Sequence, residues 1–322
     1  MNIYLITGAT GLVGKALCKL CNANNIKIHY LTTNKDKIQN TPLLKGFLWN
    51  PSKGEIDDKA FNGVKKIIHL AGANVAVRWS KAHRKNIIDS RVMGTHLLLN
   101  TVNKLQVRID QFISASAIGT YPSSRNINYT EKNKLVADNF LGEVVKDWEE
   151  AADAFTTLNI GVTKVRIGLI LDREQGAFPK MINPIRWGTG ACFGDGKQWQ
   201  SWIHIDDIAG IFLHLAEEQI TGTYNAVAPK PITQQTLIDI AAKKLKRPLL
   251  LPNIPTFVCK IIFGKMSSLL LDSHKVSSTK ISETGFNFKY TDINKALDNL
   301  IQESTFSTIE TIQKTTSSPI KN

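Results

Sequence analysis

The sequence predicts an α/β protein in which helices cover both faces of a mainly parallel, doubly wound sheet, followed by a smaller, mainly helical C-terminal region. Three observations lead to this fold class. Apolar strand segments alternate with amphipathic helical segments up to residue 171, and a glycine-rich turn joins the first strand to the first helix. After residue 229 the apolar spacing becomes helical and is broken by prolines.

The first half of the chain supplies strands and helices in alternation. Residues 3–7 form a short apolar run, and residues 12–22 carry apolar side chains at helical spacing. The same criteria predict strands at residues 26–31, 66–71, 111–114 and 162–171, and helices at residues 84–105 and 140–158. Parallel strands need long crossovers, so this alternation is typical of a parallel sheet with covering helices.

The second half is organised differently. Residues 173–200 are rich in glycine and aromatic residues and have little periodicity, so we expect an insertion that shapes a substrate cleft. A brief strand at residues 201–205, a helix at 207–218 and a last strand at 224–227 follow.

We therefore expect three segments along the chain. A first domain spans residues 1–228, and a helical C-terminal domain spans residues 229–300. Residues 301–322 are rich in Ser and Thr with few large apolar residues, and we expect a flexible tail there.

Composition limits the class of protein. Of the 322 residues, 43% are hydrophobic and 21% charged, and the mean hydropathy is −0.12. These values fit a soluble globular protein and exclude a disordered chain. No apolar run reaches the roughly 18 residues of a membrane helix, and the N-terminus lacks the basic segment of a signal peptide. We expect a cytoplasmic protein with no membrane partner.

The chain is strongly basic, with 40 Lys+Arg against 27 Asp+Glu and a net charge of +13. Only nine of the forty are Arg, and the Lys residues are scattered among many Asn. Neither a basic helix nor a motif of stacking aromatic residues accompanies the charge. We expect lysines on solvated faces and no nucleic-acid partner.

The segment Thr7-Gly8-Ala9-Thr10-Gly11-Leu12-Val13-Gly14 carries the strongest chemical signal. It follows a strand and opens a helix, as the glycine motif of Rossmann-type domains does. Gly8 permits the tight turn, Gly11 lets the backbone approach a pyrophosphate, and Gly14 lets the helix pack close to the sheet. The free N–H groups at the start of the helix, which include those of Leu12 and Val13, would face the phosphates, together with Thr10. The alternative is a glycine-rich turn with no ligand.

The spacing G-x-x-G-x-x-G resembles the short-chain dehydrogenase/reductase superfamily, in particular its extended and atypical epimerase-like branch. Several later blocks sharpen this resemblance: Ala71-Gly72-Ala73-Asn74, Arg78-Trp79, Asp89-Ser90-Arg91, Ser114 to Gly119, Asp147-Trp148-Glu149, Gly196 to His204, Gly264-Lys265-Met266 and Gly285-Phe286-Asn287-Phe288. Together they are similar to bacterial NAD-dependent epimerase-like proteins of the YfcH type, which end in a small domain of unknown function. The resemblance covers residues 1–298.

The resemblance implies a catalytic serine at Ser116 and, on the following helix, a Tyr-x-x-x-Lys pair. In that pair the tyrosine is the general acid/base, and the lysine binds the cofactor ribose and lowers the tyrosine pKa. Lys146 falls at the lysine position, but Gly142 stands at the tyrosine position. Tyr121 is the nearest candidate for the missing phenol. The alternatives are a strand-end cap for Ser116, a packed loop aromatic for Tyr121 and a solvated helix residue for Lys146.

A nicotinamide dinucleotide is the expected cofactor. The resemblance implies that Leu70, Ala71 and Gly72 line the cofactor ribose. NAD-specific folds place a carboxylate about 20 residues after the glycines. Here the second strand ends in Thr32, Thr33, Asn34 and Lys35, and Asp36 follows late. Hydroxyls and a lysine suit a 2′-phosphate, so we expect NADP(H) to be preferred over NAD(H).

Candidate substrate residues come from two segments. The resemblance adds Asn74, Arg78 and Trp79. Arg186, Trp199, Trp202 and His204 come from the aromatic and polar stretch, because Trp forms apolar walls and Arg binds carboxylate or phosphate. The alternative for the tryptophans is loop packing, and for His204 a structural role. Asp207 is expected to cap the following helix.

Cys18 and Cys21 form a C-x-x-C pair, but their helical spacing favours core packing over redox or zinc chemistry. The seven His residues show no ligand spacing, so we expect no metal. The leading function is an NADP(H)-dependent oxidoreductase or epimerase acting on a small polar or nucleotide-linked substrate, with a homodimer as a possible assembly. The alternative is a non-catalytic NADP(H)-binding sensor or interaction protein.

Overall fold

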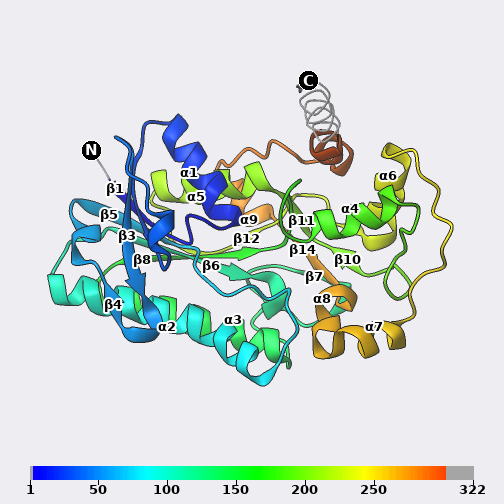
Figure 1. The fold of residues 1–322 in the computed structure, drawn as a ribbon, viewed down its shortest axis with the longest axis horizontal. Coiled ribbons are helices and arrows are strands. Elements are labelled where there is room, and N and C mark those ends of the chain that lie inside the picture. Colours follow the sequence, from blue (N-terminus) through cyan, green and yellow to red (C-terminus); the bar gives the residue numbers. More distant parts are fainter. Residues whose placement is uncertain (1–2, 302–322) are drawn as a thin grey trace, which may run out of the picture.

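The computed structural model describes residues 3–301 and has an eight-stranded sheet at its centre (Figure 1). The strand order is β12-β8-β6-β5-β1-β2-β3-β4, and every neighbouring pair is parallel except β3 with β4. The strands are β1 (Ile3–Thr7), β2 (Lys27–Thr32), β3 (Leu44–Asn50), β4 (Glu55–Ile56), β5 (Val64–His69), β6 (Gln111–Ala117), β8 (Gly161–Ile167) and β12 (Gly222–Ala226). The predicted Rossmann-type, doubly wound sheet is confirmed.

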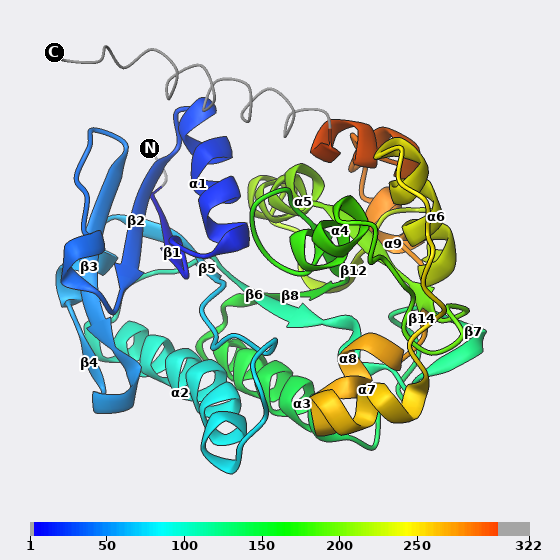
Figure 2. The ribbon, with the colours of Figure 1, turned by 45° about the vertical axis from the view of Figure 1, so that its right-hand side comes forward.

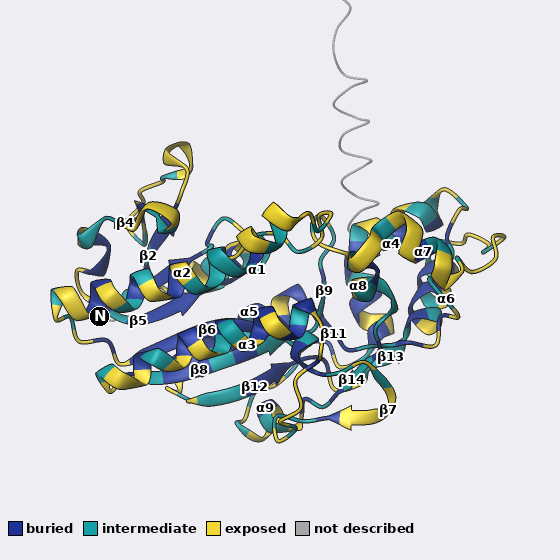
Figure 3. Ribbon diagram, turned by 90° about the horizontal axis from the view of Figure 1, so that it is seen from below, coloured by how far each residue is buried: buried dark blue, intermediate teal, exposed yellow. Residues whose placement is uncertain are grey.

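Helices cover both faces of this sheet. On one face lie α1 (Leu12–Ala23) and α5 (Ile205–Glu217), and on the other lie α2 (Lys81–Leu105) and α3 (Phe140–Asp153) (Figure 2). The apolar core is accordingly split in two by the strands. Figure 3 shows buried strands between helices whose outer faces are exposed. Because β1 lies in the middle of the order, the carboxyl edge beside it is where doubly wound folds bind ligands.

Two predicted elements are divided in the structure. The expected strand at residues 162–171 is two strands, β8 and β9 (Leu169–Leu171), because the chain leaves the main sheet at Gly168. A Cβ atom at Gly168 would lie 2.2 Å from the carbonyl oxygen of Ser201. The expected helix at residues 140–158 ends as an α-helix at Asp153 and continues as a 3₁₀ helix. Strands β3 and β4 were not predicted.

The C-terminal region is mainly helical, as predicted, and it shares one apolar core with residues 171–228, among them Phe178 and Trp202. It includes α6 (Gln234–Lys244), α7 (Thr256–Phe263), α8 (Ser268–Leu271) and α9 (Thr279–Glu283), and it packs with α4 (Phe178–Arg186) from the segment 173–200. Three short strand pairs complete it: β9 with β11 (Trp202–His204), β10 (Trp199–Gln200) with β13 (Ile232–Thr233), and β7 (Ser124–Tyr129) with β14 (His274–Val276).

The start of α5 joins this region to the sheet. The buried carboxylate of Asp207 accepts hydrogen bonds from the backbone N–H groups of Lys289 (2.7 Å) and Tyr290 (3.0 Å). Asp207 therefore does not cap α5 as expected. The N-cap is His204, whose Nδ1 accepts a hydrogen bond from the backbone N–H of Asp206 at 3.1 Å.

Within residues 3–301 no helix is long and apolar enough to cross a membrane. The flexible tail predicted from residue 301 onward lies outside the described residues, apart from its first residue.

Candidate functional site

The glycine turn between β1 and α1 leaves no room for a side chain at Gly8 or Gly14. Gly8 has a positive φ of 68°, and a Cβ atom there would lie 2.8 Å from the backbone of Leu70 and Ala71. A Cβ atom at Gly14 would lie 2.1 Å from the carbonyl oxygen of Gly8. Gly11 is the N-cap of α1 and has no side chain to cap it, and it is exposed. The first N–H groups of α1 are therefore available to an anion at the carboxyl edge.

A buried Thr–His pair holds this turn against the end of β5. The Oγ1 atom of Thr7 accepts hydrogen bonds from the backbone N–H groups of Leu70 and Ala71, both at 3.1 Å. It lies 2.7 Å from Nδ1 of His69, so it donates its own proton to that nitrogen, and the ring proton sits on Nε2. Burial, aided by the charge of Arg91, lowers the pKa of His69 to about 4 and keeps the ring neutral, although the Arg91 carbonyl acts in the opposite direction.

The end of β2 presents exposed polar groups beside the glycine turn. Thr33, Asn34 and Lys35 are exposed. Thr32 is buried, and its hydroxyl is bound to the backbone of Asn34, so this predicted cofactor residue orders the loop and does not face solvent. Asp36 is the second residue of a short 3₁₀ turn, Lys35–Lys37, and its backbone N–H donates to the side-chain oxygen of Asn34 at 2.8 Å.

A buried polar network starts at Ser116, near the carboxyl end of β6. Its hydroxyl donates to Oε1 of Glu149 at 2.6 Å. Arg166 binds both oxygens of Glu149 at 2.8 Å, and its Nη1 donates to the Tyr121 hydroxyl at 3.0 Å. Burial acts to raise the pKa of Glu149, but the hydrogen bonds and charge of Arg166 outweigh it and lower that pKa. Glu149 is thus ionised, and it accepts the one hydrogen bond that the Ser116 hydroxyl can donate.

Tyr121 does not fit the role of general acid. Its side chain is fully buried, stacks on Tyr129 at 4.9 Å and donates its proton to Oδ1 of Asn225 at 2.8 Å. Burial also raises its pKa, with Arg166 and Asn225 opposing. Tyr121 is therefore a packed loop aromatic, and the expectation that it supplies the missing phenol is corrected.

Helix α3 reaches Ser116 through Glu149. Lys146 and Val145 lie three and four residues before Glu149, so both share its side of the helix. The Lys146 side chain is 59% exposed, and its Nζ is 3.8 Å from the Glu150 carboxylate. This exposed position fits both the solvated helix residue and the ribose ligand, so the role of Lys146 at the cofactor ribose stays a prediction.

Gly142 is explained by packing. A Cβ atom there would lie 2.0 Å from the carbonyl oxygen of Ala137, in the loop that leads into α3. That loop is held by the backbone N–H of Ala137, which donates to Thr120 at 2.7 Å. No tyrosine fits at Gly142 with this backbone.

Three predicted substrate residues belong to the packing of the C-terminal region. Trp202 is fully buried, and its Nε1 donates to the carbonyl of Lys230 at 2.9 Å. His204 is 1% exposed and stacks on Tyr290 at 3.8 Å. Trp199 donates to the carbonyl of Arg125 at 3.1 Å. For Trp202 and His204 burial excludes substrate contact in this conformation, which corrects the expectation.

The other candidates lie where a ligand could meet them. Asn74 and Arg78 are exposed in the loop between β5 and α2. Trp79 is half-buried, donates to the carbonyl of Val75 at 2.8 Å and packs edge-on against Phe140. Arg186 is the last residue of α4 and is half-buried.

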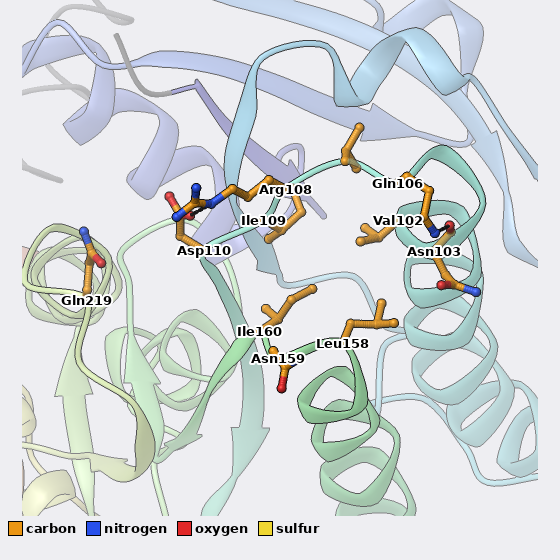
Figure 4. A pocket seen from close by; sticks show the side chains of 11 residues that line it. Val102, Asn103, Gln106, Arg108, Ile109, Asp110, Leu158, Asn159, Ile160 and Gln219 are labelled. Carbon is orange, nitrogen blue, oxygen red and sulfur yellow. Dashed lines mark hydrogen bonds and ion pairs between the residues drawn. The ribbon is translucent and has the colours of Figure 1, made fainter.

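Two cavities lie away from these residues. The larger one, about 530 Å³, is formed by the end of α2 and the loops that enter β6 and β8 (Figure 4). It is therefore at the amino edge of the sheet, opposite the glycine turn. The smaller one, about 160 Å³, lies between α4 and α6. Neither is lined by a predicted site residue.

Cys21, Cys192 and Cys259 are buried and Cys18 is half-buried, all as free thiols. Burial raises the pKa of Cys18 to about 11 and, with smaller charge effects, that of Cys21 to about 12, which leaves both thiols unreactive. Within residues 3–301 no group of three or more His, Cys, Asp or Glu side chains comes together as a metal site.

Sequence reasoning missed three residues of the carboxyl edge: His69, Arg91 and Glu149. Arg91 and Glu149 were noted only as parts of the family blocks. Their contacts join residues 18 to 62 positions apart, and no local spacing signals such pairs.

The sheet and glycine turn define a Rossmann-type α/β protein with the turn that dinucleotide-binding domains use. Residues 4–141 match the model of the NAD dependent epimerase/dehydratase family, and residues 254–300 match a domain of unknown function, DUF1731. An epimerase family protein of Staphylococcus epidermidis is 33% identical over 305 residues, covering 94% of this chain and 100% of that protein. One from Staphylococcus aureus strain N315 is 34% identical, with the same coverage. The chain belongs to the NAD dependent epimerase/dehydratase family.

Two solved structures have a similar fold. Human epimerase family protein SDR39U1 (isoform 2), solved with NADPH, has a TM-score of 0.80 and 27% identity, covering 93% of this chain and 99% of that one. UDP-glucuronic acid 4-epimerase from Bacillus cereus, in complex with UDP-glucuronic acid and NAD, has a TM-score of 0.76 over 94% of this chain and 99% of that one. At 17% identity, the second likeness concerns the fold alone.

Proposed function

We propose that this protein binds NADP(H) at the carboxyl edge of its sheet and uses it as an oxidoreductase or epimerase on a small polar or nucleotide-linked substrate. The observation that carries the proposal is the glycine turn with the uncapped N-terminus of α1. The cradle is empty of side chains at Gly8, Gly11 and Gly14, as a close-lying pyrophosphate requires. A bound nicotinamide dinucleotide would supply hydride exchange.

The preference for NADP(H) rests on the tip of β2. Thr33 and Lys35 are exposed beside the glycine turn, and they would receive a 2′-phosphate. No carboxylate stands at the strand end to bind a free 2′-hydroxyl, because Asp36 comes after the turn has begun. The human relative solved with NADPH supports the same preference.

The resemblance implies Ser116 as the catalytic serine, but its side chain is 2% exposed, so contact with a substrate would require a movement of the residues that cover it. The Ser116 hydroxyl already donates its hydrogen bond to Glu149, so only its lone pairs are left, and it would accept a hydrogen bond from a substrate hydroxyl. It would not donate to an oxyanion without a rearrangement of Glu149. This orientation favours an alcohol over a carbonyl as the group held at Ser116.

One observation favours the alternative, a non-catalytic NADP(H)-binding protein. Gly142 stands at the position where the resemblance expects the tyrosine, and the hydroxyl of Tyr121 is bound to Asn225 and Arg166, so neither position offers a phenol as a proton donor. Binding of the dinucleotide is common to both functions, and only turnover separates them.

The binding proposal is tested by Gly11→Asp. Asp is a good N-cap, so the variant should fold and keep or raise its melting temperature. The added carboxylate repels the pyrophosphate, and we expect NADPH affinity to fall by about 100-fold or more in a fluorescence titration, or about 2.7 kcal/mol. Asn22→Asp adds the same charge at the far end of α1 and should leave affinity unchanged. Equal affinity in wild type and Gly11→Asp would reject the site.

The catalytic part is tested separately with wild type. We expect NADPH to bind more tightly than NADH, and NADP⁺ to be reduced with at least one member of a panel of sugar-nucleotide and small polar alcohols. Tight NADPH binding with no turnover across alcohol and carbonyl panels would favour the non-catalytic alternative.

A further inference from the structure

Arg91 lies beside the exposed end of β5, next to the proposed dinucleotide site. A Cβ atom at Gly72 would lie 3.0 Å from Cζ of Arg91 and 3.2 Å from both terminal nitrogens. Gly72 itself is exposed. Only a residue without a side chain leaves the guanidinium of Arg91 uncovered at this point of the carboxyl edge.

The position of Arg91 is set by three contacts. Nη1 donates to the carbonyl oxygens of Ile87 (2.9 Å) and Ala73 (3.2 Å). The guanidinium packs over the ring of Trp148 on α3, with its carbon 4.8 Å from the ring centroid. These contacts orient the group, but carbonyls and a ring do not neutralise its charge.

Arg91 has no carboxylate partner among residues 3–301, and Nη2 makes no hydrogen bond there. Nε of Arg91 and Nε1 of Trp148 are both buried donors without a partner within the same residues. Burial lowers the pKa of Arg91 to about 10. By contrast, Arg166 on the same edge is paired with Glu149 through two bonds. Buried charges in proteins are normally paired, so the Arg91 region has an excess of positive charge and of donors.

We propose that Arg91 binds a phosphate or carboxylate group of a ligand that lies over Gly72. A guanidinium held in one orientation with Nη2 turned to the open side matches the oxygens of such an anion. The anion would complete the pairing that the chain lacks. It comes either from the pyrophosphate of the dinucleotide or from an anionic substrate beside it, so the inference rests on the proposed function for the place of the ligand.

The test compares Arg91→Gln with wild type using three probes. NADPH carries a pyrophosphate, and adenosine 2′-monophosphate carries the 2′-phosphate without it. Inorganic phosphate, added to protein saturated with NADP⁺, reports a free anion site through a rise in the unfolding temperature relative to chloride at the same ionic strength. We expect Arg91→Gln to weaken NADPH at least tenfold and leave adenosine 2′-monophosphate unchanged, which assigns the cofactor pyrophosphate. Loss of only the phosphate-induced shift would assign a substrate anion.

Matched variants separate binding from packing. Arg84 also lies over an aromatic ring of α3, Phe140, at 4.3 Å, and its Nε is also a buried donor without a partner within residues 3–301. It lies seven residues, about two helical turns, before Arg91, so Arg84→Gln should leave NADPH affinity within twofold. Gly72→Ala keeps Arg91 but places a methyl group against it, and should weaken NADPH or phosphate binding as Arg91→Gln does.

Three results would overturn the inference. All probes could bind Arg91→Gln and Gly72→Ala as they bind wild type. Adenosine 2′-monophosphate could lose affinity in parallel with NADPH, which indicates a distorted pocket. Arg84→Gln could match Arg91→Gln, which indicates a general effect of helix packing. Failure of wild type to bind NADPH would instead reject the proposed function, and inorganic phosphate added to the protein without nucleotide would then decide the role of Arg91.

Discussion

Glu149 holds three polar groups of the site in one arrangement. Glu149 accepts a hydrogen bond from the Ser116 hydroxyl and two hydrogen bonds from Arg166. Arg166 in turn donates a hydrogen bond to the Tyr121 hydroxyl. The Glu149 and Arg166 side chains are each 13% exposed, so their charges are mostly withdrawn from water. Loss of one partner leaves the other buried and unpaired, which is costly.

We predict that Glu149→Gln lowers the free energy of unfolding by about 3 kcal/mol at pH 7, measured by urea denaturation. The folded pKa of Glu149 lies below its ordinary value of 4.5. The stability that the ionised group contributes is therefore fully present above pH 4.5 and is lost as pH falls through the folded pKa. The difference between wild type and variant should shrink on acidification below pH 4.5.

A difference that stays constant or grows between pH 7 and pH 3 would contradict this assignment. Glu150→Gln is the matched control, because Glu150 is 65% exposed and meets only Lys146, at 3.8 Å. Its effect should stay within about 0.5 kcal/mol at either pH.

For single residues, the sequence predicts the element on which a residue lies better than it predicts the residue's hydrogen-bond partners. Gly8, Gly11 and Gly14 could be assigned from their spacing, because the turn is local. Ser116 could be placed at a strand end, but its partner Glu149 lies 33 residues away on another element. Tyr121 was wrongly chosen because nearness in sequence to Ser116 does not tell which way a side chain points.

The N-terminus of α3 departs from the expected Tyr-x-x-x-Lys pattern for a reason that belongs to the element. Asn139 caps the helix by accepting a hydrogen bond from the N–H of Gly142 at 3.0 Å, and the loop folds back until Ala137 meets Gly142. The close approach of loop and helix excludes any side chain at this position.

We predict that Gly142→Ala lowers the free energy of unfolding by about 1–3 kcal/mol, because its Cβ would lie 2.0 Å from the Ala137 oxygen. Helix propensity alone predicts the opposite, a gain of about 1 kcal/mol for Ala over Gly. Thermal or urea unfolding of the variant shows whether the clash or the propensity is the larger effect. A more stable Gly142→Ala would show that the loop yields easily and that space does not explain the glycine.

Lys146→Ala, four residues further on, is the companion variant. Since this lysine is exposed, we expect no change in stability beyond about 0.5 kcal/mol. A loss of NADPH affinity in the stable variant is expected if Lys146 binds the cofactor ribose, and unchanged affinity would reject that role.

Elements were predictable where the apolar pattern is local. Strand β1 was placed at its observed bounds, and α1 within one residue at its end. Strand β3 was missed because its residues, with Lys45, Gly46 and Asn50, give an irregular pattern whose burial depends on β2 and Phe61. The break between β8 and β9 depends on the approach of Ser201, which no local pattern reports.

Across the whole molecule, the helical C-terminal region and the sheet share buried polar contacts. Asp207 at the start of α5 binds the backbone of Lys289 and Tyr290, and His204 packs on Tyr290. The predicted division at residues 228 and 229 therefore cuts across the second apolar core, in which Phe178 and Trp202 pack with residues 237–301, as well as across this hydrogen-bonded joint.

The two neighbouring aspartates at this joint test whether the parts unfold together. Asp207 is buried, and its removal leaves the N–H groups of Lys289 and Tyr290 without their acceptor, so Asp207→Ala should lower the free energy of unfolding by about 2–4 kcal/mol. Asp206 is 47% exposed and forms a surface ion pair with Lys289, so Asp206→Ala should change the free energy of unfolding by less than about 1 kcal/mol.

We expect tryptophan fluorescence and circular dichroism to follow one coincident urea transition in both variants, because unfolding of the joint exposes both cores. Two separated transitions in Asp207→Ala, with the sheet surviving the first, would mean that the C-terminal region is an independent unit and that Asp207 only attaches it.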